Sequence, residues 1–462
     1  MAVNAPNSPK ARDIAYHVHP FTNPRRHEEE GPIIIERGEG IYIYDDAGNR
    51  YLESMAGLCC VGLGWGEERL ADVAAAQMKK LSYIQNFAHR SHSPATDLSE
   101  KLIGIAPAPL AKVFFANSGS EANDTAVKLI WYRNTALGRP EKRKIISQLK
   151  GYHGTTVVSA SMTGLPYVHA GFGLPLPGFL HVETPHFYHG GRQGESEEDY
   201  ASRLAAQLDA LIVAEGPETV AAFVAEPVIA SGGMIVPPAG YFQKVQVVLR
   251  KHDVLMVADE VICSFGRTGH MFGCETLGIV PDLMVVAKQL SSAYIPISGV
   301  LMSDAFYEGL KEGGDQFGIV GTGFTYSAHP VAAAVALETL AIYEERDLVS
   351  HAATVGAYMR EQFSKLLDHP LVGEVRGVGL MAGIELVKDK ESHANFAPAS
   401  KVGAKFSEIA ISHGLLIRPL ADDTLALSPP LIITQAEIDE LLSLVSATIV
   451  DFTAWIGAEQ PD

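Results

Sequence analysis

The chain has little cysteine. It holds four in 462 residues: Cys59, Cys60, Cys263 and Cys274. Four cysteines are too few for a disulfide framework, and their spacing matches no zinc-binding pattern. We expect reduced thiols and no bound metal ion.

Long apolar runs are also missing. No segment offers the uninterrupted stretch of about 18 apolar residues that a membrane-spanning helix needs. Residues 1–10 are polar and rich in proline, and they lack the apolar centre of a secretory signal. These absences lead us to expect a cytoplasmic protein that does not enter a membrane.

Basic residues are scarce. The sequence has 36 Lys and Arg against 54 Asp and Glu, a formal net charge of −18. Nucleic-acid binding needs clustered basic side chains, so we expect no nucleic-acid partner. The hydrophobic content of 47% allows a large core. Small molecules are the expected partners.

Helical and extended patterns alternate through the middle of the chain. We expect helices at 96–105, 121–135, 200–214 and 240–252, and strands at 112–116, 144–148, 220–225, 255–258 and 283–287. Such alternation is typical of an α/β fold, with a mainly parallel sheet flanked by helices.

The two ends of the chain differ from this middle part. Residues 1–30 are polar and predict a tail, and 41–53 alternate as a hairpin does. An Ala-rich helix is expected at 331–345, and a capping box at 434–437 opens the last helix. We therefore divide the chain into an N-terminal segment with hairpin (1–64), a large domain (65–327) and a smaller α+β domain (328–462), which the hairpin helps to complete.

Two charged residues follow apolar runs. Asp259 follows the run 255–258, and Lys288 follows the run 283–287. Alone, Asp259 could cap a strand and Lys288 could lie on the surface. Together they mark the carboxyl ends of two buried strands, where ligands of open α/β sheets bind. Pyridoxal phosphate needs such a pair, because its aldehyde condenses with a lysine and its ring nitrogen needs a carboxylate.

A second group of motifs could hold a phosphate and a flat ring. Asn117-Ser-Gly-Ser120 joins a strand to a helix, and free backbone N–H groups at such a helix start can bind phosphate. An ordinary N-cap would give the same sequence pattern. Tyr152, in Gly151-Tyr-His-Gly154, offers an aromatic face, or is a core tyrosine. The turn around Thr322 adds further donors.

Two other patterns are weaker. The sequence 377–382 fits a loose dinucleotide fingerprint, but 381–386 predicts a strand where that fingerprint requires a helix, so we reject it. A possible metal cluster comprises His181, Glu183, His186 and His189. These residues fall in a loop bounded by Pro and Gly, and we expect solvated histidines there instead.

Taken together, these motifs resemble the class III pyridoxal-phosphate-dependent aminotransferases, and among them the omega-transaminases of the amine:pyruvate type. The resemblance runs from Met55 to Leu431. Its most specific pieces are 118–123, 151–154, Ala225-Glu-Pro227 and the block from Asp259 to Lys288. It implies the fold of the fold type I transferases and a homodimer, or a tetramer.

The resemblance also implies the roles of individual residues. Lys288 would form the Schiff base with the cofactor and move the proton. The implied cofactor contacts are Asp259 at the ring nitrogen, Val261 and Tyr152 on the two ring faces, Gly119 and Ser120 at the phosphate with Thr322 of the neighbouring subunit, and Glu226 near the ring hydroxyl.

The implied substrate pocket contains Cys59, Phe87, Tyr152, Tyr167, Ser231 and Arg418. Arg418 would pair with a substrate carboxylate, because a guanidinium binds carboxylate through two parallel hydrogen bonds; alternatively, it forms a structural ion pair with Asp422 or Asp423. Many relatives carry Trp at the position of Cys59, which predicts a roomier pocket. Cys59 could also be a core residue that faces away.

The expected reaction is a ping-pong transamination from an amine donor to a keto-acid acceptor such as pyruvate, with S-selectivity and tolerance of bulky or aryl amines. The alternatives are a decarboxylase-transaminase, an aminomutase or a racemase on the same scaffold, or a catalytically silent relative that binds the cofactor. Lys288, Asp259 and Tyr152 are all present, which argues against the silent relative.

Overall fold

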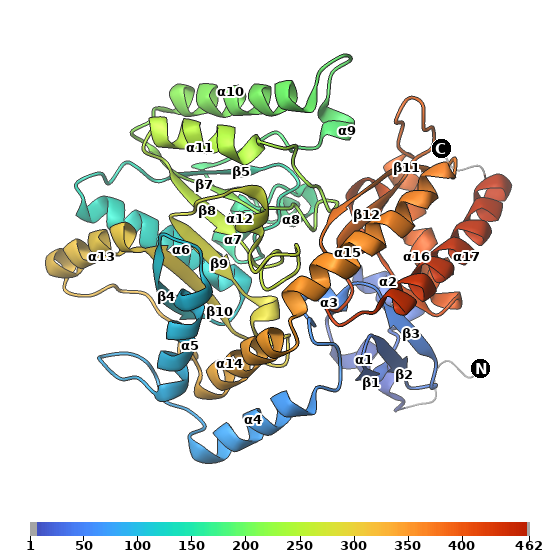
Figure 1. Ribbon diagram of the computed structural model, residues 1–462, viewed down its shortest axis with the longest axis horizontal. Coiled ribbons are helices and arrows are strands. Elements are labelled where there is room, and N and C mark those ends of the chain that lie inside the picture. The colour runs from blue at the N-terminus through green and yellow to red at the C-terminus, as the bar shows by residue number, and fades with distance from the viewer. Residues whose placement is uncertain (1–6, 460–462) are drawn as a thin grey trace.

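A seven-stranded sheet forms the centre of the computed structural model, which describes residues 7–459 (Figure 1). In spatial order its strands are β4 (Leu110–Ala116), β10 (Ser298–Ser303), β9 (Leu283–Val286), β8 (Leu255–Asp259), β7 (Val220–Ala225), β5 (Lys144–Gln148) and β6 (Phe179–Val182). Within this sheet, as described, only β10 runs antiparallel to its neighbours. The predicted α/β fold with a mainly parallel sheet is confirmed.

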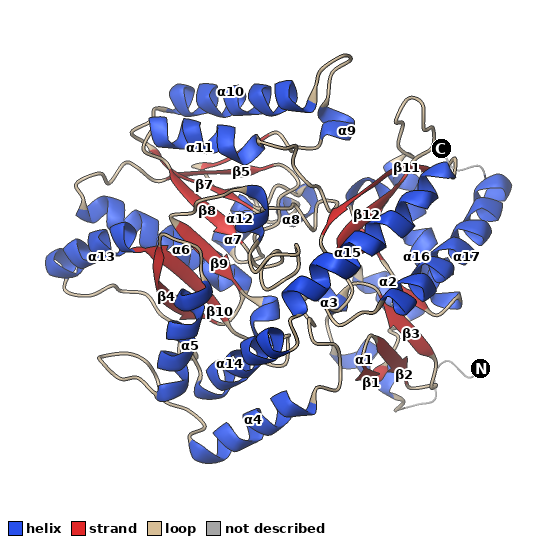
Figure 2. Cartoon of the chain, in the orientation of Figure 1, coloured by secondary structure: helices blue, strands red, loops and turns tan. Residues whose placement is uncertain are grey.

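The inner strands are buried on both faces, which explains their continuous apolar sequences. On β8, Met256 and Ala258 point into the core on one face of the sheet, and Val257 between them points into a second core cluster. Helices cover both faces (Figure 2). They are α5 (Ser93–Ile105), α6 (Gly119–Ala136), α7 (Val157–Met162), α10 (Glu197–Glu215), α11 (Tyr241–Lys251), α13 (Asp304–Phe317) and α14 (Pro330–Glu345), and α4 (Glu68–Lys80) packs against α14. Parallel strands need this double cover.

A second region follows α14. Its sheet contains β11 (Val372–Val378), β12 (Met381–Leu386), β15 (Thr424–Leu427) and β14 (Arg418–Pro419). The helices beside it are α15 (Leu348–Ser364), α16 (Val402–Ser412) and α17 (Gln435–Glu459). The strand at 381–386 is therefore the second arm of a hairpin, as expected when the dinucleotide fingerprint was rejected.

The N-terminal hairpin joins this second region. β1 (Ile35–Glu39), β2 (Tyr42–Asp45) and β3 (Arg50–Glu53) form an antiparallel sheet, and β13 (Leu415–Leu416) adds to β3 in parallel. Asp45 Oδ1 accepts hydrogen bonds from the backbone N–H groups of Ala47 and Asn49 and so holds the tight turn. Segments more than 350 residues apart in sequence therefore share one sheet.

The segment before the hairpin is more ordered than the polar tail we expected. It forms α1 (Pro9–Tyr16) and α2 (Pro24–Glu30). Ser8 and Asn23 cap these helices by accepting from backbone N–H groups, and each helix starts with a proline. The caps and N1 prolines are sequence signals of helix starts, and the polar composition of the segment obscured them.

One helix in the described part of the chain, α17, has the length and hydropathy of a membrane span. Its buried stripe contains Ile438, Leu441, Val445, Ile449 and Phe452. This stripe belongs to the main core, and α17 packs against α15 and α16. Such a stripe is typical of a helix that covers a soluble core.

Candidate active site

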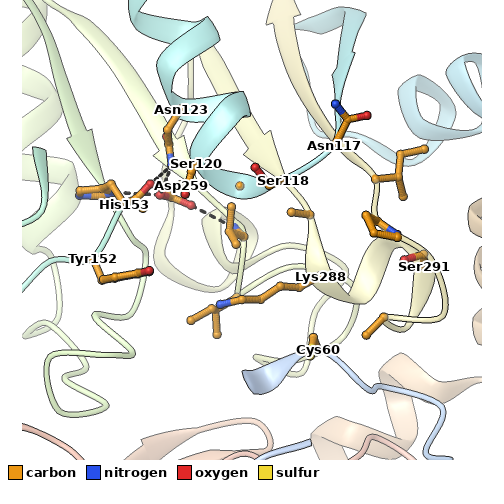
Figure 3. Close-up of a pocket in the computed structure, with 18 of the residues that line it drawn as sticks. Cys60, Asn117, Ser118, Ser120, Asn123, Tyr152, His153, Asp259, Lys288 and Ser291 are labelled. Carbon is orange, nitrogen blue, oxygen red and sulfur yellow. Dashed lines mark hydrogen bonds and ion pairs between the residues drawn. The ribbon is translucent and has the colours of Figure 1, made fainter. Parts of the chain in front are cut away.

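The two charged residues at the strand ends lie side by side. β8 and β9 pair in parallel, with Asp259 opposite Val285, and the chain reaches Lys288 three residues later. Lys288 begins the short 3-10 helix η1 (Lys288–Ser291) with a φ of 49°. A positive φ is costly for a residue with a side chain, and such strain tends to cluster at functional sites. The lysine side chain extends into the middle of the pocket (Figure 3).

Asp259 is almost fully buried, and three donors satisfy its carboxylate. Asn123 Nδ2 and His153 Nδ1 each lie 2.8 Å from Oδ2, and the backbone N–H of Val261 donates to Oδ1 at 3.1 Å (Figure 3). A buried carboxylate is stable only with such partners. These bonds fix the direction in which the carboxylate faces the cavity.

His153 is the closest ionisable neighbour of Asp259. Burial alone would lower the pKa of this imidazole, but the hydrogen bond to Asp259 and the negative charge of that residue outweigh burial and raise the pKa. His153 and Asn123 stand within the motifs 151–154 and 118–123, but the motifs alone indicate no role for either residue. The sequence did offer one signal for a site role: His153 directly follows Tyr152, and Asn123 lies three residues after Ser120.

The turn between β4 and α6 forms the opposite wall. Ser118 is the N-cap and accepts from the N–H of Glu121, so Gly119 and Ser120 occupy the first helical turn rather than a loop before the helix. The N-terminus of this 18-residue helix thus faces the cavity with free N–H groups and a positive dipole end. Such an end suits a phosphate.

Small residues are required where this turn meets its neighbours. A Cβ on Gly119 would lie 3.1 Å from both methyls of Val261. Gly154 has a φ of 133°, and a Cβ there would lie 2.5 Å from Ser159 Oγ and overlap Ser120 Oγ. Ser120 Oγ in turn accepts from the N–H of Thr155. The glycines therefore allow two loops to approach the helix start.

Glu226 lies behind Tyr152. One carboxylate oxygen accepts from the N–H of Tyr152 at 2.9 Å, and the other accepts from the N–H of Ala230 at 3.1 Å. Burial, together with the charge of Asp259, raises the pKa of Glu226 to about 7, while His153 and the two backbone bonds oppose this rise. Glu226 thus holds the backbone of the aromatic residue in place.

These residues line a cavity of about 320 Å³, which is joined to a smaller one of about 130 Å³. Tyr152, Ile262 and Lys288 line both. The larger cavity contains the predicted cofactor residues Gly119, Ser120, Tyr152, Glu226, Asp259, Val261 and Lys288. The smaller one contains the predicted substrate residues Cys59, Tyr152, Tyr167, Ser231 and Arg418.

Cys59 therefore faces the cavity, although only 3% of it is exposed. It ends the turn α3 (Ala56–Cys59), and Cys60 after it lines the larger cavity. Phe21 also lines the smaller cavity, with its ring 6.3 Å from that of Tyr167 in an edge-on arrangement. Phe21 is not among the predicted pocket residues, because the polar composition of residues 1–30 predicts a tail.

Arg418 has no carboxylate partner in the part of the chain that the structure describes. Asp422 pairs instead with Lys150, and Asp423 accepts from the N–H of Gly403. The alternative of an ion pair between Arg418 and either aspartate is wrong. A guanidinium that lines a cavity can pair with an anionic group through two parallel hydrogen bonds, so the predicted role of Arg418 toward a substrate carboxylate stays a prediction.

Two predicted residues lie elsewhere. Phe87 and Thr322 share a concavity of about 940 Å³ at the edge of the large sheet. Lys128 Nζ donates to Thr322 Oγ1 at 2.7 Å. In this chain, therefore, neither residue reaches the cavity that holds Lys288. The assignment of Thr322 to a neighbouring subunit stays a prediction, and any contact of Phe87 with substrate also requires a second copy.

The histidines of 181–189 do not form one cluster. His181 bonds to the carbonyl of Met162, and Glu183 lies near Arg203. His186 and His189 pair with Glu374 and Glu385 from β11 and β12. The expectation of solvated histidines was wrong for His186, which is buried. Only the tertiary structure brings the acidic partners from the second region.

The comparisons agree with this geometry. The family model described as "Aminotransferase class-III" matches residues 24–449. The chain is 47% identical to gamma aminobutyrate transaminase 3, chloroplastic, from Solanum lycopersicum, over 92% of this chain and 81% of that one. It is 45% identical to gamma-aminobutyrate transaminase 1, mitochondrial, from Oryza sativa subsp. indica, over 96% and 87%.

Solved structures are similar over nearly the whole chain. The omega transaminase from Pseudomonas jessenii, in complex with PMP, has a TM-score of 0.96 and 52% identity, and the match covers 97% of this chain and 99% of that one. A tryptophan-to-glycine variant of a thermostable omega transaminase, engineered for asymmetric synthesis of enantiopure bulky amines, has the same TM-score and identity, with 97% and 100% covered.

PMP is the amine form of pyridoxal phosphate, and this site fits that cofactor. A lysine, a buried and satisfied carboxylate, an aromatic side chain and an open helix N-terminus surround one cavity. The chain belongs to the class III aminotransferases, which use pyridoxal phosphate.

Proposed function

We propose that this aminotransferase is an omega-transaminase of the amine:pyruvate type, with preference for S-amines and tolerance of bulky or aryl donors. One observation carries the proposal: among the described residues, the cavity beside Lys288 has apolar walls and one arginine, Arg418, which no carboxylate of residues 7–459 pairs with. The apolar walls suit an amine, and the arginine suits the keto acid that follows it in the same site.

The chain's own residues support such a reaction. Bound pyridoxal phosphate supplies an electron sink next to the carbon that loses a proton. Lys288 Nζ extends into the cavity as the amine that takes this proton and returns it; a positioned base contributes about 10² to 10⁴ in rate. Asp259, held by Asn123 and His153, faces the same cavity with a charge that stabilises a protonated ring nitrogen.

The size of the donor pocket follows from Cys59. Its small side chain lines the cavity, and the family resemblance implies that many relatives carry tryptophan at this position. Removing an indole frees volume next to the reacting carbon and also removes contact surface for small amines. The engineered neighbour for bulky amines, a tryptophan-to-glycine variant, supports this reading.

A second candidate donor is 4-aminobutyrate, because relatives at 45–47% identity are named as gamma-aminobutyrate transaminases. Arg418 would pair with the carboxylate of such a donor. The two candidates differ in how the first half-reaction depends on Arg418. An aryl amine has no carboxylate and should react without this arginine, whereas 4-aminobutyrate should not.

The experiment is a half-reaction assay on the holoenzyme. Each enantiomer of 1-phenylethylamine, or 4-aminobutyrate, is added without acceptor, and the visible absorbance of the bound cofactor is followed; pyruvate is then added. The proposal expects loss of the band with the S-amine and recovery with pyruvate. Reaction with 4-aminobutyrate alone would assign the second candidate. No reaction with any donor would contradict transamination at this site.

Arg418→Ala sharpens this test. Discharge by the aryl amine should keep its rate within about threefold, while recovery by pyruvate should slow by at least tenfold, since a bidentate charged pair contributes about 1.5–3 kcal/mol. Lys150→Ala, which removes the partner of nearby Asp422, is the control for a general disturbance of this loop. Equal slowing of both half-reactions would contradict the proposed role.

We also propose a homodimer whose second copy places Thr322 and Phe87 at the site. The support is the large concavity that holds both residues and the exposed apolar side chains Phe87 and Ile319 in it. Analytical sedimentation of the wild type and of Phe87→Arg tests this dimer. The positive charge of the new arginine should shift the variant from dimer towards monomer and weaken its binding of the cofactor. A wild type that sediments as a monomer would refute the proposed dimer.

A further inference from the structure

Four side chains in the N-terminal segment converge on one point. Asp13 and His17 lie four residues apart at the end of α1, on the same face of the helix. His19 follows in the extended linker, and His27 projects from α2. We call Asp13, His17, His19 and His27 the N-terminal histidine cluster. It lies outside the cofactor cavity.

The three hydrogen bonds between members of the cluster all go to the Asp13 carboxylate. His19 Nε2 lies 2.8 Å and His27 Nε2 3.0 Å from Oδ1, and His17 Nδ1 lies 3.2 Å from Oδ2. The ring centroids of His17 and His19 are 4.5 Å apart, and those of His19 and His27 are 4.2 Å apart. One carboxylate thus gathers three imidazoles.

This geometry is close to that of a metal site. Four ligands held about 2.1 Å from a zinc ion in a tetrahedron lie about 3.4 Å from one another. The ligand atoms of Asp13, His17 and His19 all lie within 4.8 Å of one another, and His27 Nε2 is bonded to the same carboxylate. Small rotations of the side chains would open enough space for an ion.

The chemistry of the cluster also suits a cation. Imidazole nitrogen and carboxylate oxygen are ligands for zinc and similar divalent ions. Each histidine can carry its single proton on the nitrogen that faces away from Asp13, which leaves a lone pair towards the ion. His17 and His19 are partly exposed, so the outer N–H can be solvated. Among the described residues, the ion-pair partners of Asp13 are these three histidines, with no Lys or Arg.

We propose that the N-terminal histidine cluster binds one divalent transition-metal ion of the zinc class. The ion ties α1 to α2 through Asp13, His17, His19 and His27. The linker between the two helices carries Phe21, which lines the substrate cavity. Metal binding therefore fastens the segment that places an aromatic side chain at this cavity.

The second histidine group, His186, His189 and Glu385, is a weaker candidate. There, Arg376 Nη1 pairs with Glu374 at 2.5 Å and with Glu385 at 2.6 Å. A guanidinium already supplies the positive charge between these carboxylates, and it would repel a second cation at close range. No such cation competes within the N-terminal cluster as described.

The test uses cobalt as a spectroscopic probe on tag-free, full-length holoenzyme freed of metal by a chelator. Tetrahedral Co²⁺ gives visible bands at longer wavelength than the cofactor, and equilibrium dialysis counts bound ions. We expect one Co²⁺ per chain with tetrahedral bands that stoichiometric Zn²⁺ abolishes. Absence of binding, or purely octahedral bands at excess metal, would overturn the proposal.

Variants assign the ion to its ligands. His19→Gln and Asp13→Asn should each weaken Co²⁺ binding by at least tenfold. His17→Gln changes the most exposed ligand, with 62% of its side chain accessible, so it tests the site if the others disturb folding. The controls are His413→Gln, an exposed histidine paired with Asp451, and His189→Gln in the other group. Binding that survives all three cluster variants, or that only His189→Gln removes, would refute the assignment.

Discussion

His153 and Asp259 form a buried pair, with imidazole Nδ1 2.8 Å from carboxylate Oδ2, and the amide of Asn123 reaches the same oxygen at the same distance. One oxygen thus takes two donors, and the other accepts from the N–H of Val261. The carboxylate cannot rotate without breaking bonds to three separate segments. This arrangement keeps the carboxylate of Asp259 directed at the cavity that the Lys288 side chain also enters.

Loss of this pair should weaken cofactor binding. In His153→Ala the buried Asp259 loses a charge-assisted donor, a loss of about 1.5–3 kcal/mol. We expect the dissociation constant of pyridoxal phosphate to rise about tenfold or more, measured from the visible absorbance on titration. Asn134→Ala is the matched control, because Asn134 is buried on α6, the helix of Asn123, and its side chain bonds to the carbonyl of Lys142 and to Arg133 rather than to Asp259. Equal effects of the two variants would contradict the pairing role.

Lys288→Ala should abolish covalent attachment of the cofactor. Borohydride treatment of the wild type should fix the cofactor to one peptide that contains Lys288, as seen by mass spectrometry. The variant should show no such label and lose about 10² to 10⁴ in turnover. Lys112→Ala, at an exposed position on β4, should keep both properties. A label on another lysine would show that the assignment is wrong.

Cys59→Trp should reverse the selectivity for amine size. Cys59 lines a cavity of about 130 Å³, which an indole would largely fill. We expect the ratio of kcat/KM for a bulky amine to that for a small amine to fall at least tenfold. Cys60→Ala, in the neighbouring cavity wall, should leave the ratio near its original value. An unchanged ratio in Cys59→Trp would refute the role of this position.

Gly154→Ala should impair the phosphate end of the site. Gly154 has a φ of 133°, and the new Cβ would lie 2.5 Å from Ser159 Oγ. The strain costs about 1–3 kcal/mol, and relief by movement of the loop would displace Ser120. Cofactor affinity and melting temperature should both fall. Gly104→Ala in α5, where a Cβ meets nothing within 4 Å, should preserve affinity and raise stability slightly.

Glu53 should make stability depend on pH. Burial raises its pKa to about 7, while the N–H groups of Gly57 and Met55 oppose this rise. The folded state therefore binds a proton that the unfolded state has released between about pH 4.5 and 7, so stability falls as pH rises through this window. The contribution is on the order of 3 kcal/mol, at 1.36 kcal/mol per pKa unit.

Urea unfolding of wild type and Glu53→Gln at pH 5 and pH 7.5 measures this dependence. The neutral amide can still accept from the N–H of Gly57, as the carboxyl does. The variant should lose less stability than the wild type over this interval. Parallel curves for the two proteins would show that Glu53 does not titrate in the window.

Short-range patterns accounted for much of the molecule. Alternation of helix and strand predicted the main sheet, and the end of each apolar run located Asp259 and Lys288, because parallel strands place their carboxyl ends at one edge. The boundaries were less certain. The helix after β4 begins at Gly119, since Ser118 takes the N-cap and brings Ser120 into the first turn.

Local sequence is enough to predict the strands, the turn of small residues and the chemistry of the residues after the strands, because these depend on neighbours a few positions apart. Three features are visible only in the folded chain: His153 and Asn123 share Asp259, Arg418 has no aspartate partner among residues 7–459, and Phe21 lines the cavity beside Lys288. These contacts join segments far apart in the chain, and no local periodicity records which distant side chains will meet in a packed core.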